Sequence, residues 1–277
     1  MPKLPSSRVA LSFESSLLST FLKGSSFAAL PLSTKDVDIP YFVQKKIGNH
    51  YLLLMAEGGS DYNHAVTALT AKSLWGPYVP CTINPVLTHR HLGKDYPVQS
   101  LGHADLVQTP TGDWYAVFLG KRIVEGGPVP LGRETFLCEV SFQSGEPIFN
   151  PGIGVIGNRL KRPLLPWTPV SKTDKQNDFE SSALSPEWAT MRIPEQPLHH
   201  FADGNLFLSL RPEMADSLVC PSMLLHRVHS HNFSAITTMT FSTCQANEWA
   251  GLVLYRTAKG YYSLLKGKNE IRLTIDK

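Results

Sequence analysis

Short apolar runs separated by polar turn clusters make up most of the chain after residue 50. Residues 51–56 form a compact apolar run, and residues 65–70 are rich in β-branched side chains and half polar. Between them, residues 57–63 contain two glycines, an aspartate and an asparagine, which are residues favoured in tight turns. Two β-type runs joined by such a cluster predict a hairpin.

The same arrangement recurs further along the chain. Residues 104–108 and 114–119 are apolar runs on either side of Pro110–Asp113, and residues 135–142 alternate between inward and outward positions. Because no window keeps a helical period over three turns, the pattern predicts an all-β protein. Meanders of short strands joined by turns are typical of β-propellers and β-sandwiches.

Proline and basic residues interrupt this pattern after residue 157, most densely in Lys161–Pro166. Proline fixes φ and lacks a backbone N–H, so a segment of this kind cannot join the interior of a sheet. We therefore interpret residues 158–176 as a linker between one domain at residues 40–157 and another at residues 177–277.

A second β-rich region follows the linker, and its spacing of strands and turns predicts a β-sandwich. The expected strands are residues 206–210, 222–229, 235–243, 250–257, 261–266 and 270–275. Since Lys277 comes directly after the last run, we expect this sandwich to be incomplete.

Residues 1–39 do not share the strand pattern. They are rich in Ser and Leu, with Lys3 and Arg8 ahead of a weakly apolar run that Glu14 interrupts. A secretory signal needs an uninterrupted apolar region and a small-residue cleavage site, so we interpret these residues as a leader without packed structure. Localisation stays open, with the cytoplasm favoured over secretion.

The composition argues against two classes of partner. The 277 residues are 42% hydrophobic and 18% charged, and the formal net charge of +3 is spread without a block of Lys or Arg. A nucleic-acid-binding protein concentrates its basic residues on a stripe or run, and a membrane span needs about 20 consecutive apolar residues. We therefore expect neither nucleic acid nor a membrane as partner, and the oligomeric state stays undetermined.

The four cysteines, at positions 81, 138, 220 and 244, form no CxxC pair and no zinc-ligand spacing. No metal site is predicted from them. Cys138 and Cys244 lie in strand-like runs, where a free thiol packs as a small hydrophobe. We expect buried free thiols, with disulfides or a reactive cysteine as the alternatives.

Six short motifs occur in one order along the first domain. They are AEGG at 56–59, YNHA at 62–65, SLWGPY at 73–78, NPVLT at 84–88, QSLGHAD at 99–105 and LGRET at 131–135. In this order and spacing, the segment resembles the later blades of the five-bladed β-propeller of glycoside hydrolase family 43, in particular its β-xylosidase/α-arabinofuranosidase-like members.

The second domain is similar to the concanavalin-A-like β-sandwich appended to those enzymes, in the motifs NDFE at 177–180, LSPEW at 184–188 and MR at 191–192. The resemblance therefore implies an all-β chain in which a partial five-bladed β-propeller precedes a truncated concanavalin-A-like β-sandwich.

The resemblance also implies a chemistry. Family members hydrolyse O-glycosyl bonds of xylan-derived oligosaccharides with three carboxyl groups: an aspartate base, a second aspartate that tunes the acid, and a glutamate acid. The anomeric centre is inverted, which requires acid and base carboxyl groups about 6.5–9.5 Å apart. No organic cofactor is implied, and the expected partner is an oligosaccharide that contains xylose or arabinose.

The chain departs from the family pattern at these carboxyl groups. The base and the tuning aspartate belong to blades that precede residue 51 in the family, and we expect both to be missing here. Asp38, in Asp38–Tyr41, falls at the place of the acid and is the candidate general acid, although the similarity could instead begin at Pro40. We therefore expect impaired activity, with a non-catalytic carbohydrate-binding remnant or a truncated gene product as alternatives.

Three side chains are predicted to bind substrate by the same resemblance. The family histidine that matches His103 projects into the central cavity, and the arginine that matches Arg133 contacts sugar hydroxyls and carboxylates, a task suited to a fixed guanidinium fork. Gln99 is a weaker candidate. The alternatives are a hydrogen-bonded core histidine for His103 and an ion pair with Glu134 for Arg133.

Other conspicuous residues are expected to be structural. Glu57 lies in a tight turn with two glycines, and Trp75 belongs to a turn that packs a blade. Asp178 begins the sandwich, where related domains can hold calcium. A calcium site needs six or more oxygen ligands, so calcium remains an option that we do not predict.

Overall fold

A computed structural model of the protein describes residues 42–124, 129–169, 177–180 and 183–276. The chain divides into two compact units, with the boundary between Pro166 and Trp167. This boundary lies inside the segment expected to be a linker.

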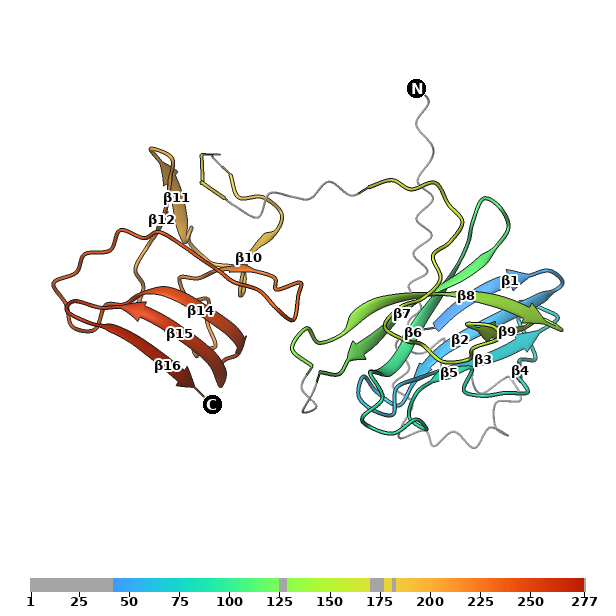
Figure 1. Ribbon diagram of the computed structural model, residues 1–277. Helices are drawn as coiled ribbons and strands as arrows, with labels where there is room; N and C mark the ends of the chain where they lie inside the picture. Colours follow the sequence, from blue (N-terminus) through green and yellow to red (C-terminus); the bar gives the residue numbers. More distant parts are fainter. Residues whose placement is uncertain (1–41, 125–128, 170–176, 181–182, 277) are drawn as a thin grey trace, which may run out of the picture. The chain divides into compact units, whose positions relative to one another are not determined.

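The first sheet of the first unit has five strands (Figure 1). They are β1 (Phe42–Ile47), β2 (His50–Glu57), β3 (Ala65–Ala71), β4 (Val79–Pro80) and β5 (Leu87–Thr88). The order is β1-β2-β3-β4, and β5 pairs with the other end of β3. β2 and β3 pair antiparallel from Tyr51↔Ala71 to Glu57↔Ala65, which confirms the predicted hairpin and its turn.

The second sheet of this unit is a four-stranded antiparallel meander in the order β6-β7-β8-β9. Its strands are β6 (Val98–Gln108), β7 (Trp114–Arg122), β8 (Glu134–Gln143) and β9 (Glu146–Phe149). The predicted runs at 104–108, 114–119 and 135–142 all lie within these strands. The pairing of β6 with β7 shifts register twice, between Gln99 and Gly102 and between Gly102 and Asp105.

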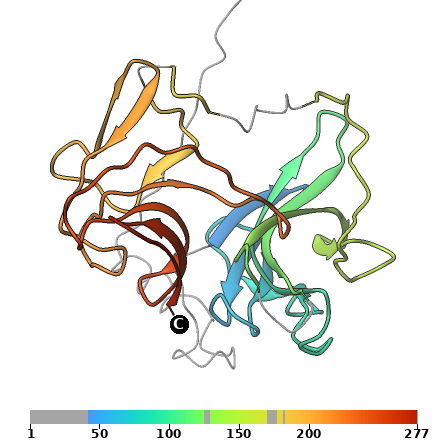
Figure 2. The same cartoon turned by 60° about the vertical axis from the view of Figure 1, so that its left-hand side comes forward.

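The two sheets pack against one another across one apolar core (Figure 2). Leu52 and Leu54 of β2 meet Leu106 of β6 and Phe118 of β7 in this core, and each of these side chains is at most 2% exposed. Side chains alternate between the two faces of a strand, so Leu53 points to the opposite face of the first sheet. There it packs in a second cluster, and both faces of the first sheet therefore carry buried apolar side chains.

The second unit is built of three small sheets, which pair as β10 with β13, β11 with β12, and β14-β15-β16. The strands are β10 (Trp188–Thr190), β11 (His199–Ala202), β12 (Asn205–Leu208), β13 (Leu224–His226), β14 (Ala250–Thr257), β15 (Gly260–Lys266) and β16 (Ile271–Asp276). The last three agree closely with the predicted runs.

One of the strands predicted for the second unit does not form, so that prediction is wrong. Residues 235–243 are described and contain no strand, and their side chains are mostly exposed. The β-branched composition of this run favours an extended backbone, but a strand also needs a neighbour with which to exchange backbone hydrogen bonds. Similarly, only Leu224–His226 of the predicted run 222–229 is paired.

The structure confirms an all-β chain over the described residues, which contain strands and no helix. Within the same residues, no helix is long and apolar enough to cross a membrane. All four cysteines lie in the described part and are free thiols; Cys81 and Cys138 are buried as expected. Cys244, which comes directly after the run predicted at 235–243, is exposed.

Candidate functional site

His103 lies on an irregular stretch of β6. Ser100 and His103 have φ angles of 56° and 58°, which non-glycine residues rarely adopt. The two register shifts against β7 fall in the same stretch. An insertion of this kind bends a strand and re-aims its side chains, and such bulges are common beside functional sites. We call Gln99–His103 the β6 bulge.

A buried histidine of the β2–β3 turn packs against the β6 bulge. His64 is 3% exposed, and its Nδ1 lies 3.2 Å from the carbonyl oxygen of Ser100. Its ring covers Gly102 so closely that a Cβ added there would lie 2.2 Å from His64 Nε2. Position 102 therefore requires glycine, because any larger residue would overlap the ring of His64.

Positive charge surrounds the two histidines. Arg133, exposed in the turn before β8, and Lys121 of β7 are the neighbouring cations. Burial lowers the pKa of His103, and Arg133 lowers it further. Burial is also the largest cause that lowers the pKa of His64; the hydrogen bond with the Ser100 carbonyl opposes it, and the charges of Arg133, His103 and Lys121 lower the pKa further. Both imidazoles are therefore favoured in the neutral form, which can accept a hydrogen bond as well as donate one.

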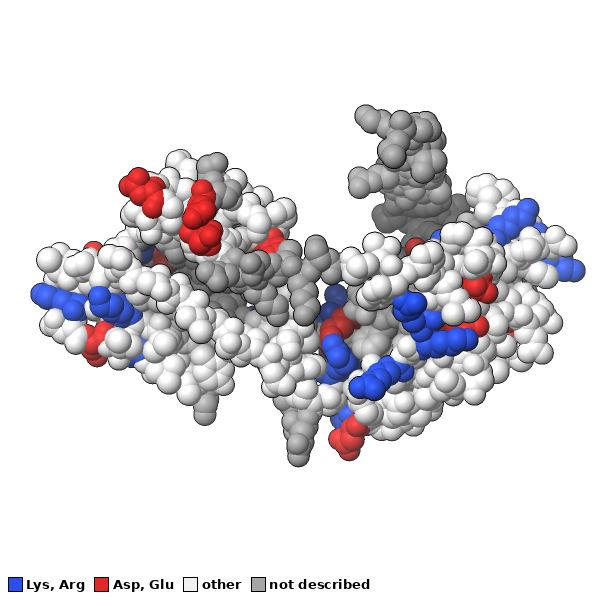
Figure 3. All heavy atoms as spheres, turned by 45° about the horizontal axis from the view of Figure 1, so that its top comes forward, with Lys and Arg blue, Asp and Glu red and all other residues white. Residues whose placement is uncertain are grey.

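The carboxylate next to Arg133 is engaged by another arginine. Glu134 accepts hydrogen bonds from Arg122 Nε at 2.9 and 3.1 Å and forms an ion pair with the same guanidinium. The ion pair considered for Arg133 and Glu134 from the sequence is thus made by Arg122. On the face shown in Figure 3, acidic side chains lie among the basic ones of the first unit.

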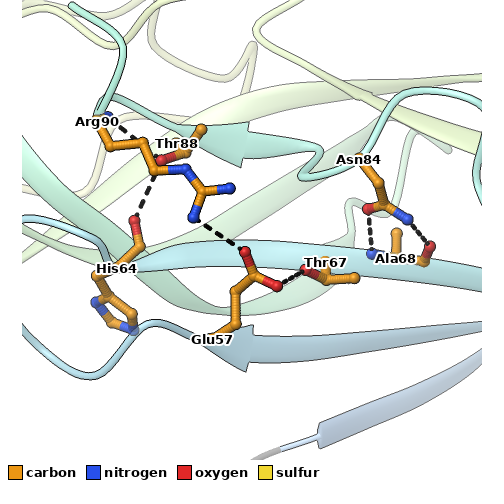
Figure 4. Close-up of polar contacts among 7 residues, drawn as sticks. All are labelled: Glu57, His64, Thr67, Ala68, Asn84, Thr88 and Arg90. Carbon is orange, nitrogen blue, oxygen red and sulfur yellow. Dashed lines mark hydrogen bonds and ion pairs between the residues drawn. The ribbon is translucent and has the colours of Figure 1, made fainter. Parts of the chain in front are cut away.

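Glu57 is held by a network rather than presented to solvent (Figure 4). Its Oε2 accepts a hydrogen bond from Thr67 Oγ1 at 2.7 Å, and its Oε1 lies 3.2 Å from Arg90 Nη1. The backbone N–H of Arg90 donates to Thr88 Oγ1, which donates in turn to the carbonyl of His64, both at 3.3 Å. We call Glu57, Thr67, Thr88 and Arg90 the Glu57 network.

Two further contacts fix the turn that leads to His64. Lys121 Nζ lies 2.7 Å from Asp61 Oδ1, and the Tyr62 hydroxyl donates to the carbonyl of Arg90. The same Arg90 also belongs to the Glu57 network. The turn is therefore attached to β7 through Lys121 and to the segment after β5 through Arg90.

Gln99 begins the β6 bulge but is almost fully enclosed. It is 2% exposed, and its Nε2 donates to the carbonyls of Gly93 and Tyr96. Among the described residues, its Oε1 has no hydrogen-bond partner. These contacts indicate that Gln99 holds the 93–96 loop in its conformation.

The remaining candidates lie elsewhere or outside the described residues. Trp75 is 75% exposed in the turn after β3, and Asp178 accepts a backbone hydrogen bond from Glu180. Within the described ranges, no group of three His, Cys, Asp or Glu side chains could hold a metal ion. Asp38 lies outside the described residues.

The structure thus brings His103 and Arg133 together, and it adds His64 and Lys121, which the sequence reasoning did not select. His64 stands in one of the quoted motifs, two residues after Tyr62. The only signal in the sequence was that His64 and Gly102 stand in two of the quoted motifs. Because the two residues are far apart in the chain, no local periodicity predicts their contact.

Two family models match the chain in the order expected from its motifs. Glycosyl hydrolases family 43 matches residues 33–147, and the β-xylosidase C-terminal concanavalin A-like domain matches residues 176–275. The chain carries a glycosyl hydrolase family 43 domain and the concanavalin A-like domain that follows it in β-xylosidases. The first match begins at residue 33 and therefore includes Asp38.

Known family 43 proteins agree with this assignment. A xylosidase/arabinosidase of Butyrivibrio fibrisolvens is 36% identical over 259 residues, 91% of this chain and 50% of the relative. The non-reducing end α-L-arabinofuranosidase BoGH43B of Bacteroides ovatus is 34% identical, covering 89% of this chain and 46% of the relative. The chain thus spans about half the length of these relatives.

Solved family 43 structures share the fold. The crystal structure of BlXynB from Bacillus licheniformis matches with a TM-score of 0.72 and 28% identity, covering 85% of this chain and 47% of that one. The described units therefore have the fold of the corresponding parts of a family 43 protein with its concanavalin A-like domain.

Proposed function

We propose that the protein is a glycoside hydrolase that acts on O-glycosyl bonds of xylan-derived oligosaccharides, of the β-xylosidase/arabinofuranosidase type. The observation that supports it most is the position of His103 on the β6 bulge, within the electrostatic influence of Arg133 and inside the segment that family 43 matches. The relatives are xylosidases and arabinosidases, which supports a xylose- or arabinose-containing substrate.

The two sheets of the first unit are, in this proposal, two blades of a five-bladed propeller. Propeller blades are four-stranded antiparallel sheets around a central channel. Both sheets contain such a four-strand path. The first sheet also has buried apolar side chains on both faces, as a blade between two neighbours requires. The proposed domains are 40–157 and 177–277, with 158–176 as linker.

His103 and Arg133 are proposed to bind the sugar. Xylose and arabinose are neutral and present hydroxyl groups, which both donate and accept hydrogen bonds. A neutral imidazole can match either role, and the exposed guanidinium supplies fixed donors. Gln99 contributes indirectly, through the 93–96 loop to which its amide is bonded.

Asp38 is proposed as the general acid of an inverting reaction. β1 begins at Phe42, and the register pairs Phe42 with Met55, two residues before Glu57. The start of β1 is therefore at the same end of the sheet as His64 and the β6 bulge. A carboxyl group that donates a proton near neutral pH must have its pKa raised by its surroundings.

The test is hydrolysis of p-nitrophenyl β-D-xylopyranoside and p-nitrophenyl α-L-arabinofuranoside by the full chain. We expect release of p-nitrophenol that Asp38→Asn abolishes, and that His103→Gln and Arg133→Ala reduce by raising KM. Asp113→Asn, in the β6–β7 turn, is the matched carboxylate control and should leave the rate unchanged. No release with either substrate would contradict hydrolysis by this chain.

A second candidate function is binding of carbohydrate without turnover. It is favoured by the contacts of Glu57, the acidic residue of the AEGG motif. Both oxygens of this carboxylate are already bonded, one to Thr67 and the other to Arg90, so the group is occupied by a structural role. Calorimetric titration with xylobiose separates the two candidates, because binding that depends on His103 and Arg133 without product release supports this one. Absence of both binding and turnover would refute both functions.

A further inference from the structure

We propose that His64 is a positioning residue, whose ring and Nδ1–H hold the β6 bulge in the conformation that presents His103 beside Arg133. The conformational part of this inference stands on contacts among described residues. Its consequence for sugar binding and hydrolysis rests on the function proposed above.

The ring of His64 is in direct contact with the backbone of the β6 bulge. At Gly102, a Cβ would lie 2.2, 2.3 and 2.5 Å from Nε2, Cδ2 and Cε1 of His64. Real Cβ atoms do not approach other heavy atoms so closely, because interiors are close-packed and resist overlap. The imidazole therefore fills the volume directly above the residue that precedes His103.

The hydrogen bond of His64 acts on the same stretch. Nδ1 is 3.2 Å from the carbonyl oxygen of Ser100, and a carbonyl can only accept, so this nitrogen carries the proton. Ser100 and His103, at the two ends of the contact, both have left-handed φ angles. Such conformations are unfavourable for residues with a side chain and persist only where the surroundings determine them. The ring of His64 and its Nδ1–H hold the backbone of Ser100 and His103 at these angles.

The position of His64 is itself fixed from the opposite side. Its backbone N–H donates to Asp61 at 3.0 Å, and its carbonyl accepts from Thr88 of the Glu57 network at 3.3 Å (Figure 4). The ring is therefore a rigid spacer between the β2–β3 turn and the β6 bulge. Displacement of this spacer would allow Ser100–His103 to return to a regular strand, which would turn the His103 side chain.

Three substitutions separate the two contributions of His64. His64→Phe keeps a ring against Gly102 and removes the N–H; His64→Asn keeps a donor close to the position of Nδ1 and removes the ring face; His64→Ala removes both. Gly102→Ala perturbs the contact from the other side, because the added Cβ overlaps the ring. The double variant Gly102→Ala/His64→Ala removes that overlap.

His89, directly after β5, offers a matched control within the same unit. It is 1% exposed, and its Nδ1 lies 2.6 Å from the carbonyl of Val98, also on β6. Its Nε2 accepts from the backbone N–H of Ile156 at 3.0 Å. His89→Gln thus removes an equally buried histidine bonded to the same strand, but its contact lies before the β6 bulge.

The readout that does not depend on activity is the titration of His103, followed by NMR of the full chain with labelled histidines. The His103 resonance is assigned by its loss in His103→Gln. Burial and the charge of Arg133 lower the pKa of His103, and His64 and Lys121 are the other titratable groups of this cluster. We expect its pKa to rise in His64→Ala and Gly102→Ala, to rise less in His64→Phe and His64→Asn, and to stay unchanged in His89→Gln.

Activity and binding provide the second readout. A catalytic group misplaced by about 1 Å can cost about a hundredfold in rate, so we expect kcat/KM to fall by about this factor in His64→Ala. If the chain binds without turnover, the affinity for xylobiose should fall instead. His64→Asn should recover part of the loss, whereas a residue that only stabilises the fold would alter neither the titration of His103 nor this order of variants.

An unchanged His103 titration in folded His64→Ala and Gly102→Ala would overturn the positioning role, whatever the activity. Equal shifts in His89→Gln and His64→Ala would also overturn it, because they would indicate a general loss of packing. If the wild-type chain neither binds nor hydrolyses sugar, the proposed function fails, but the NMR comparison still decides on His64.

Discussion

Removal of the Glu57 carboxylate is the most direct test of how the β2–β3 turn is held. Glu57 ends β2, its side chain is 18% exposed, and its two partners come from β3 and from the segment after β5. Glu57→Ala deletes both interactions at once. Glu57→Gln keeps an oxygen for Thr67 but removes the charge that faces Arg90.

The magnitude follows from the burial of the three side chains. Thr67 is 8% exposed, and a hydrogen bond to a charged group contributes about 1.5–3 kcal/mol. The Arg90 side chain is 38% exposed, so solvent screens the ion pair and its share is at most about 1 kcal/mol. We expect Glu57→Ala to lower the free energy of unfolding of the first unit by about 2–3 kcal/mol, and Glu57→Gln by about 1 kcal/mol.

Hydrogen exchange resolved by peptide is the assay, because it reports each unit separately within the full chain. Protection of amides in β2 and β3 should fall in Glu57→Ala, whereas amides of β14 and β15 in the second unit serve as internal reference. Asp61→Asn is the control, since the Asp61 side chain is 91% exposed and its surface ion pair with Lys121 should contribute much less protection than the contacts of Glu57. Loss of less than about 0.5 kcal/mol in Glu57→Ala would refute the reasoning, since it would mean that the buried carboxylate is not engaged as the geometry indicates.

Two further predictions use the titration of buried groups. Burial lowers the pKa of His64 and of His89 below 6.5, so each folded state binds fewer protons than the unfolded chain. The free energy of unfolding should therefore be unaffected by these groups above about pH 6.5. It should fall by at most about 1.4 kcal/mol per histidine per pH unit as the pH drops from there toward the lowered folded pKa. Hydrogen exchange of β2 and β6 amides measures this fall, and a flat profile between pH 7.5 and 5.5 would contradict the prediction. Burial raises the pKa of the Cys81 and Cys138 thiols to about 12, so a thiol-directed reagent at pH 7.5 should label exposed Cys244 and spare both until the chain unfolds.

The sequence predicts those features that depend on neighbours along the chain. The β2–β3 hairpin follows from a turn cluster between two β-type runs, and the all-β class follows from the absence of any helical period. The strand expected at 235–243 shows the converse. Its composition favours an extended backbone, but a strand also needs a neighbouring strand with which to pair. That neighbour is formed by residues elsewhere in the chain, so the run itself does not predict the pairing.

The candidate site shows the same division between local and distant information. His103 and Arg133 could be selected because they stand in motifs that resemble a family, but the resemblance assigned His64 no role. The contact of His64 with Gly102 depends on two register shifts in β6 and on left-handed φ angles at Ser100 and His103. Ser rarely adopts such an angle, and although His adopts it more often than most non-glycine residues, neither identity is enough to predict it.

The motifs that carried the resemblance are joined by contacts in the first unit. Gly58 of the AEGG motif has a φ of 74°, and a Cβ there would lie 2.2 Å from the carbonyl oxygen of Asn63 in the YNHA motif. Because this close approach sets the path of the turn, it also sets where His64 emerges, and the ring of His64 in turn determines that Gly102 has no side chain. A substitution at Gly58 should therefore act on His103 through two contacts, although Gly58 lies in the β2–β3 turn of the first sheet and His103 in β6 of the second. The spacing of the motifs along the sequence reflects this chain of contacts, and the small residues within it are required by the volume that their partners occupy.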